Sequence, residues 1–157
     1  KPIDDVMLFA RLAKLDPVTG AVIRAAEVLG ADLAYLGTRF LASRESGAAE
    51  VHKQDVIESK AEDIIYTNIF TGIPGNYIKQ TLTKAGLDID NLPKFSPETA
   101  KYQRTETGEV KIWKDIRGCG HGCGSIHEQE STAEIVALLE AQYHEAHKAM
   151  QSNVFAN

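Results

Sequence analysis

The chain has 157 residues, and its 22 acidic side chains outnumber its 17 lysines and arginines, which gives a net charge of −5. This charge disfavours a polyanionic partner such as nucleic acid. No apolar run approaches the ~20 residues that cross a bilayer, so we expect a cytoplasmic protein without a membrane partner.

The amino-terminal part is predicted to hold two helices. Apolar residues recur at helical spacing over residues 4–14, and a strand over residues 6–9 is the alternative. A second helix is expected to begin after Thr19, which would cap it, and to end at Gly30 in the left-handed conformation. This helix would lead into a short buried strand over residues 33–36, so that the two form a helix–strand unit of a parallel sheet.

The end of that strand is a candidate ligand site. Ligands of parallel α/β sheets bind where the carboxyl ends of strands lead into loops. Gly37 would let a phosphate approach the backbone because it has no Cβ, and Thr38 adds a hydroxyl donor. The alternative is a simple turn.

The rest of the chain alternates helical and strand signals. Residues 46–59 favour a helix, residues 63–70 favour a strand, and Tyr77 begins a further helical pattern that stops at Gly86. Residues 87–110 are expected to form a long irregular connection. The clearest helix covers residues 131–150, where Ser131 and Glu134 have the spacing of a capping box.

Residues 24–43 resemble the seventh helix and eighth strand of the nitronate monooxygenase (2-nitropropane dioxygenase) family. The likeness continues through residues 61–67, 70–72, 113–116 and 118–124. Members of this family are FMN-dependent TIM barrels, and a whole barrel takes ~250 residues. The resemblance therefore implies an α/β fold, namely the carboxyl-terminal part of a TIM (β/α)8 barrel with an inserted α-rich lid. The first residue, Lys1, likewise leads us to expect a portion of a longer enzyme.

The resemblance divides the chain into three parts. Residues 1–45 would hold the last helix–strand units of the barrel with the FMN phosphate site. Residues 46–110 would form the lid, which covers the flavin and excludes water. Residues 111–157 would hold a glycine-rich loop and the closing barrel helix. Arg39 has two interpretations, an ion pair that fixes the lid helix or a phosphate contact, and Tyr66 and Tyr77 either reach substrate or pack the lid.

The resemblance also implies the residues of the phosphate site. Gly37 and Thr38, with the backbone of Tyr35 and Leu36, would form the cradle, and Gly20 would contribute from the opposite side. The family's paired-glycine turn falls near residues 15–16, which are Leu and Asp here. An acidic side chain repels a phosphate, so this half of the site is altered, the local alignment is shifted, or residues are missing.

The implied activity is the oxidation of alkyl nitronates by dioxygen to a carbonyl compound and nitrite. The partners are then a small-molecule nitronate and dioxygen. The chain could also form a homo-oligomer. The family's catalytic histidine lies on an earlier strand, so none of the five histidines inherits that role, and we expect the isolated chain to be inactive and to bind FMN poorly. The alternatives are an FMN-dependent enoyl-thioester reductase of the same family and a non-catalytic interaction or metal-binding domain.

Two groups of side chains raise other hypotheses. Cys119, His121 and Cys123 lie between glycines, and thiolates and imidazole bind zinc, but three ligands at this spacing favour a backbone-rich turn over a metal site. A cysteine nucleophile assisted by His121 is a further alternative. Along the last helix, a Glu and two His recur on one face, where an ordinary charged surface is favoured over a divalent ion; they are Glu140, His144 and His147. The cysteines are expected to be reduced thiols.

Overall fold

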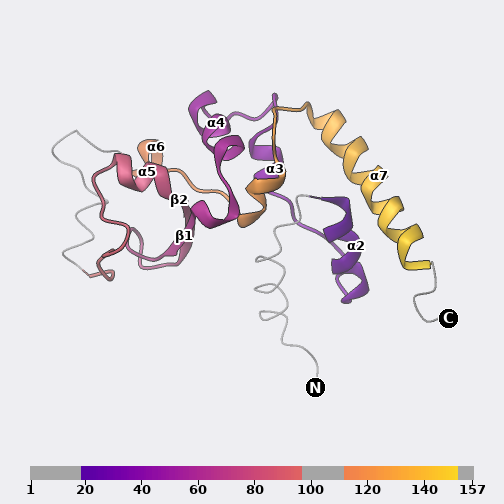
Figure 1. The fold of residues 1–157 in the computed structure, drawn as a ribbon, viewed down its shortest axis with the longest axis horizontal. Coiled ribbons are helices and arrows are strands. Elements are labelled where there is room, and N and C mark those ends of the chain that lie inside the picture. Colours follow the sequence, from indigo (N-terminus) through magenta and orange to yellow (C-terminus); the bar gives the residue numbers. More distant parts are fainter. Residues whose placement is uncertain (1–18, 97–111, 152–157) are drawn as a thin grey trace, which may run out of the picture.

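The computed structural model describes residues 19–96 and 112–151, and the helix predicted over residues 4–14 lies outside them. Short helices precede and follow a two-stranded hairpin, and one long helix closes the described chain (Figure 1). The elements are α2 (Gly20–Val28), α3 (Thr38–Leu41), α4 (Glu50–Glu58), η1 (Ala61–Asp63), β1 (Ile64–Thr67), β2 (Gly75–Ile78), α5 (Lys79–Lys84), α6 (Ile112–Asp115), η3 (His121–Ser125) and α7 (Thr132–Gln151). Among these described helices, none is long and apolar enough to cross a membrane.

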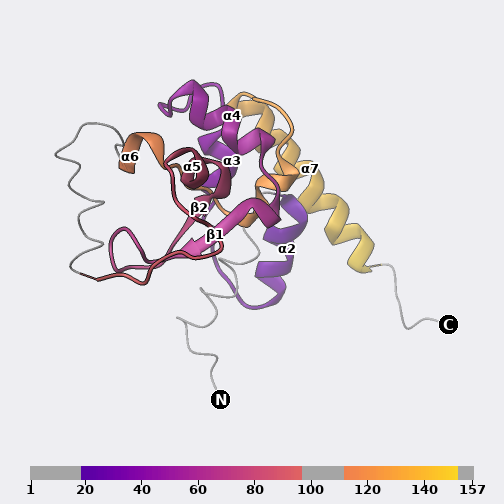
Figure 2. The same cartoon turned by 60° about the vertical axis from the view of Figure 1, so that its left-hand side comes forward.

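Helices α2 and α7 lie side by side, as both views show (Figures 1 and 2). The caps that the sequence predicts for them are confirmed. The Thr19 hydroxyl accepts from the N–H of Val22 at 3.4 Å, and Gly30 has φ +94° just after α2. At α7, the Ser131 N–H donates to Glu134 at 2.7 Å, and the Glu134 N–H donates back to the Ser131 hydroxyl at 3.2 Å.

The strand predicted within residues 63–70 is confirmed as β1, which pairs antiparallel with β2. Ile64 is opposite Ile78 at one end of this pairing, and Thr67 is opposite Gly75 at the other. The helix predicted from Tyr77 begins later, at α5, because Tyr77 and Ile78 belong to β2. It stops at Gly86, φ +80°, as predicted. Residues 46–96 therefore hold a hairpin as well as helices.

Two groups of buried apolar side chains form the core. One joins α4, the hairpin and the glycine-rich loop, and its members are Ala42, Val56, Ile64, Ile78, Cys119, Cys123 and Ile126. The other lies around Phe70, whose ring meets Tyr77 edge-on at 4.9 Å, and includes Ile69, Leu82 and Ile116. The glycine-rich loop thus contributes to the core, and Tyr77 packs there, as one of its two interpretations expects.

Within this chain, residues 33–36 do not form the buried strand that the sequence predicts, so the prediction is wrong for the structure described. These residues belong to no helix or strand, and the side chains of Leu33 and Tyr35 are 90% and 85% exposed. A strand is defined by hydrogen bonds to a neighbouring strand, and the one sheet in residues 19–96 and 112–151 is the β1–β2 hairpin. The parallel helix–strand unit expected here is consequently absent from the described structure. Residues 87–96 are irregular as predicted, and residues 97–110 lie outside the description.

Candidate functional site

The candidate ligand site lies where α3 meets the glycine-rich loop. Gly37 immediately precedes α3 and is exposed, and a Cβ built on it meets no atom within 4 Å. Thr38 is buried beside it, and its hydroxyl oxygen accepts a hydrogen bond from the N–H of Gly120 at 2.8 Å. A hydroxyl that accepts keeps its own hydrogen for donation. The two residues therefore offer open backbone and one hydroxyl donor, which suits an anion such as a phosphate.

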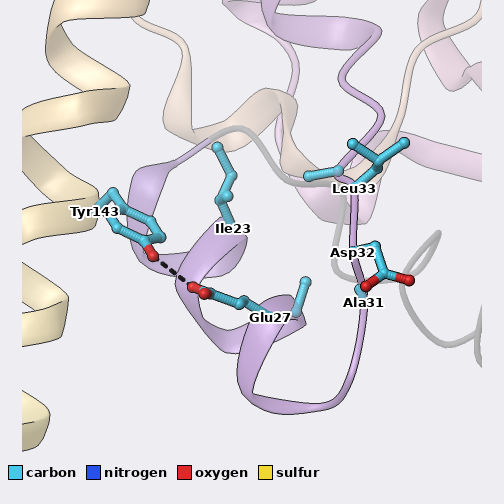
Figure 3. A pocket seen from close by; sticks show the side chains of 8 residues that line it. Ile23, Glu27, Ala31, Asp32, Leu33 and Tyr143 are labelled. Atoms are coloured by element: carbon cyan, nitrogen blue, oxygen red, sulfur yellow. Dashed lines mark hydrogen bonds between the residues drawn. The ribbon is translucent and has the colours of Figure 1, made fainter.

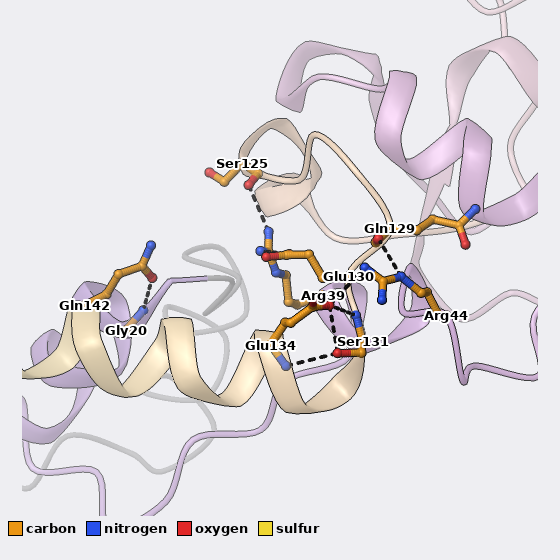
Figure 4. Close-up of polar contacts among 9 residues, drawn as sticks. All are labelled: Gly20, Arg39, Arg44, Ser125, Gln129, Glu130, Ser131, Glu134 and Gln142. Atoms are coloured by element: carbon orange, nitrogen blue, oxygen red, sulfur yellow. Dashed lines mark hydrogen bonds and ion pairs between the residues drawn. The ribbon is translucent and has the colours of Figure 1, made fainter.

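Arg39 forms an ion pair, as the first of its two interpretations expects, but the pair does not fix the lid helix. The buried guanidinium donates to the Ser125 carbonyl at 3.1 Å and pairs with Glu130 (Figure 4). The partner is the segment before α7 rather than the helix α4. Arg44 holds the same region, since it donates to the Gln129 carbonyl at 3.3 Å. Arg39 thus fastens α3 to the start of α7.

The glycine-rich loop is fixed by its neighbours. The Gly118 carbonyl lies 2.9 Å from Nε2 of His52, and a Cβ on Gly118 would lie 2.5 Å from the carbonyl oxygen of Asn76. Cys119 and Cys123 are buried without a disulfide between them, and the Cys123 side chain has no exposed surface. A thiol hidden in this way lacks the access that a nucleophile needs, so the structure supports the interpretation of the loop as a backbone-rich turn.

The metal hypotheses gain no support from side-chain placement. Within residues 19–96 and 112–151, no three His, Cys, Asp or Glu side chains gather closely enough to hold an ion. On α7, His144 lies 3.9 Å from Glu140 in an exposed pair, and Nε2 of His147 lies 2.9 Å from Nε2 of Gln151. These contacts are those of a charged helix surface.

Of the other predicted phosphate residues, Gly20 lies apart from this junction. Gly20 is buried where α2 crosses α7, and its N–H donates to the Gln142 side chain at 2.9 Å (Figure 4). A Cβ there would lie 2.0 Å from the Leu139 carbonyl, so glycine is needed at this position for helix packing. Tyr35 and Leu36 precede Gly37 in the extended segment. The phosphate contacts of Gly20, Tyr35 and Leu36 stay predictions.

A pocket that the sequence did not indicate opens between α2, the extended segment and α7 (Figure 3). Its volume is about 370 Å³, and mainly small or apolar side chains line it: Ile23, Ala26, Glu27, Ala31, Asp32, Leu33, Ala34 and Tyr143. The Tyr143 hydroxyl donates to Glu27 at 2.5 Å, and Arg24 pairs with the same carboxylate at 2.6 Å. The hydrogen bonds from Tyr143 and Arg24 lower the pKa of Glu27, and the bond to Glu27 raises the pKa of Tyr143.

Solved structures share this arrangement of elements over 85% of the chain. FabK from Thermotoga maritima matches with a TM-score of 0.63 at 24% identity, over 44% of its own chain. Nitroalkane oxidase from Streptomyces ansochromogenes matches with a TM-score of 0.63 at 27% identity, over 39% of its chain. The chain is thus an α/β fragment with the fold of part of these proteins.

The sequence comparisons all match one family of proteins. A family model described as nitronate monooxygenase matches residues 18–150. A probable nitronate monooxygenase of Staphylococcus saprophyticus is 42% identical over 77 residues, which are 48% of this chain and 22% of the relative. One of Staphylococcus aureus is 36% identical over 107 residues, 65% of this chain and 30% of the relative. The chain belongs to the nitronate monooxygenase family and spans less than a third of these relatives.

Proposed function

We propose that this chain is the carboxyl-terminal part of an FMN-dependent nitronate monooxygenase, an oxidoreductase that converts alkyl nitronates and dioxygen into a carbonyl compound and nitrite. The observation that carries this proposal is the family match over residues 18–150. The likeness to a nitroalkane oxidase supports a nitro compound or its nitronate as substrate. In the complete enzyme, residues 33–36 would become a barrel strand once neighbouring strands pair with them.

The residues at the α3 junction fit the phosphate of FMN. Open space beside Gly37 lets the phosphate approach the backbone, and the Thr38 hydroxyl keeps a hydrogen to donate. Neither the N–H of Gly37 nor that of Thr38 donates to an acceptor in the described part of the chain. The backbone of Tyr35 and Leu36 would complete the cradle. Gly20 would contribute from the opposite side once its N–H exchanges the Gln142 side chain for the phosphate. Bound FMN would supply the redox chemistry, and these residues would hold it in place.

The segment over residues 46–110 would act as the lid over the flavin. Tyr66 fits a substrate contact better than Tyr77 does, since the Tyr66 side chain is exposed on β1 while Tyr77 packs on Phe70. A lid at this place would exclude water from the reacting carbanion and position it near the flavin.

The test uses the full natural polypeptide that contains this chain. We expect the purified protein to be yellow and to consume oxygen with propionate 3-nitronate or nitroalkanes, with nitrite as a product. Consumption of NADPH that depends on an enoyl thioester would instead identify the enoyl-thioester reductase. A colourless protein that carries stoichiometric zinc by elemental analysis would contradict both flavin assignments and favour a metal-binding domain.

A further inference from the structure

Contacts from three elements converge on Arg117, just before the glycine-rich loop. Its side chain pairs with Asp55 of α4, and each of the two side chains is only 11% exposed. Its N–H donates to the Thr81 hydroxyl of α5 at 3.2 Å, and its carbonyl accepts from Ile78 of β2 at 2.8 Å. The backbone of Arg117 is therefore held by β2 and α5, and its side chain is held by α4.

Gly118, the next residue, is also held in place by α4 and the hairpin. His52, one turn before Asp55 on α4, contacts the Gly118 carbonyl at 2.9 Å. The Asn76 carbonyl lies so close to Gly118 that no side chain fits between them. Contacts from α4, β2 and α5 thus fix where the loop begins.

The loop in turn contacts the candidate phosphate residue. The N–H of Gly120 donates to the Thr38 hydroxyl oxygen at 2.8 Å. Because that N–H points at one lone pair of the oxygen, the hydroxyl hydrogen must point away from the loop amide. A shift of Gly120 would release the hydroxyl to rotate, and its hydrogen would no longer have a fixed direction.

We propose that Asp55 is a positioning residue for the FMN phosphate, acting through Arg117 and Gly120 on the hydroxyl of Thr38. This inference rests on the proposed function, and it adds that a carboxylate of α4 controls how well the phosphate is held. Asp55 and Arg117 are nearly buried, so loss of the carboxylate leaves the guanidinium without its charged partner and allows the loop to move.

The test compares FMN with riboflavin, which has the same ring system but no phosphate, by quenching of flavin fluorescence in the natural polypeptide. We expect Asp55→Asn to raise the dissociation constant of FMN about tenfold, the usual effect of losing one hydrogen bond to a charged group, and to leave that of riboflavin unchanged. Glu58→Gln is the matched control, because Glu58 is an exposed carboxylate on the same helix that contacts Gln54, and it should change neither constant.

A double-mutant cycle tests the route through Thr38. Thr38→Val should weaken the binding of FMN and leave the binding of riboflavin unchanged. Adding Asp55→Asn to Thr38→Val should cause no further loss of FMN affinity, since both substitutions act on one hydroxyl. His52→Ala loosens the same loop through a different contact, so it should reproduce the selective loss of FMN at a smaller size if Asp55→Asn fails to fold.

The outcomes separate the inference from the function. Equal weakening of FMN and riboflavin by Asp55→Asn, no change in either, or additive losses in the double variant would each overturn the positioning role. A wild-type polypeptide that binds neither flavin would contradict the proposed function itself.

Discussion

The glycine-rich loop and the extended segment before α3 are opposite cases within one chain. The loop has few side chains, yet Cys119 and Cys123 are buried in the core, and Arg117, just before the loop, pairs with Asp55, which is 62 residues away in the sequence. The extended segment carries Leu33 and Tyr35, yet both are almost fully exposed, and Leu33 borders a pocket. Contacts within the described chain therefore determine the structure of the loop, whereas the large apolar side chains of the extended segment make little buried contact within it.

The largest expected difference between the two regions comes from truncating one apolar side chain in each. Ile126→Ala removes a side chain that is 1% exposed in the core beneath the loop and should lower the free energy of unfolding by about 2–5 kcal/mol. Leu33→Ala removes an exposed side chain and should change it by less than about 0.5 kcal/mol. Urea unfolding followed by circular dichroism measures both. Equal effects would show that the extended segment is packed in the isolated chain.

A glycine in each region allows a second comparison, with an expected stability difference of intermediate size. Gly118→Ala places a Cβ against the Asn76 carbonyl and should cost about 1–3 kcal/mol of stability, as overpacking does. Gly37→Ala meets open space and should leave the unfolding midpoint nearly unchanged. In the flavin-binding polypeptide, Gly37→Ala should still weaken FMN, because its Cβ would occupy the approach of the phosphate. A large loss of stability from Gly37→Ala would contradict the open geometry beside α3.

The smallest expected effect is the pH dependence of stability that comes from Glu27, which lines the pocket. Hydrogen bonds from Tyr143 and Arg24 lower the pKa of Glu27 in the folded state below its ordinary value of 4.5. The stability that Glu27 contributes is therefore present above pH 4.5 and is lost as the pH falls through the lowered pKa. Tyr143→Phe should lower the melting temperature slightly at neutral pH, and the difference from wild type should shrink below pH 4.5. A difference that stays constant down to pH 3 would contradict the role of the Glu27 charge.

Local signals predicted the helices well, since caps and stops act over a few residues. Thr19, Gly30 and the pair Ser131 and Glu134 all have the predicted roles. The strand β2 was missed because Tyr77 and Ile78 also fit a helical pattern, and only pairing with β1 decides between the two.

At the candidate site, the sequence did not predict the contacts between residues that are far apart in the chain. Thr38 and Gly37 were singled out by their chemistry, but the Gly120 amide that meets Thr38 is 82 residues away. No local spacing connects Asp55 to Arg117 either. The buried strand over residues 33–36 failed for a related reason, because an apolar run is a strand only when another strand lies beside it.

A crystal structure of the full natural polypeptide with FMN tests the central claim most directly. The account predicts that the phosphate lies within hydrogen-bonding distance of the Thr38 hydroxyl and against the backbone of Gly37, with residues 33–36 paired as a strand. A phosphate bound away from Gly37 and Thr38 would contradict it.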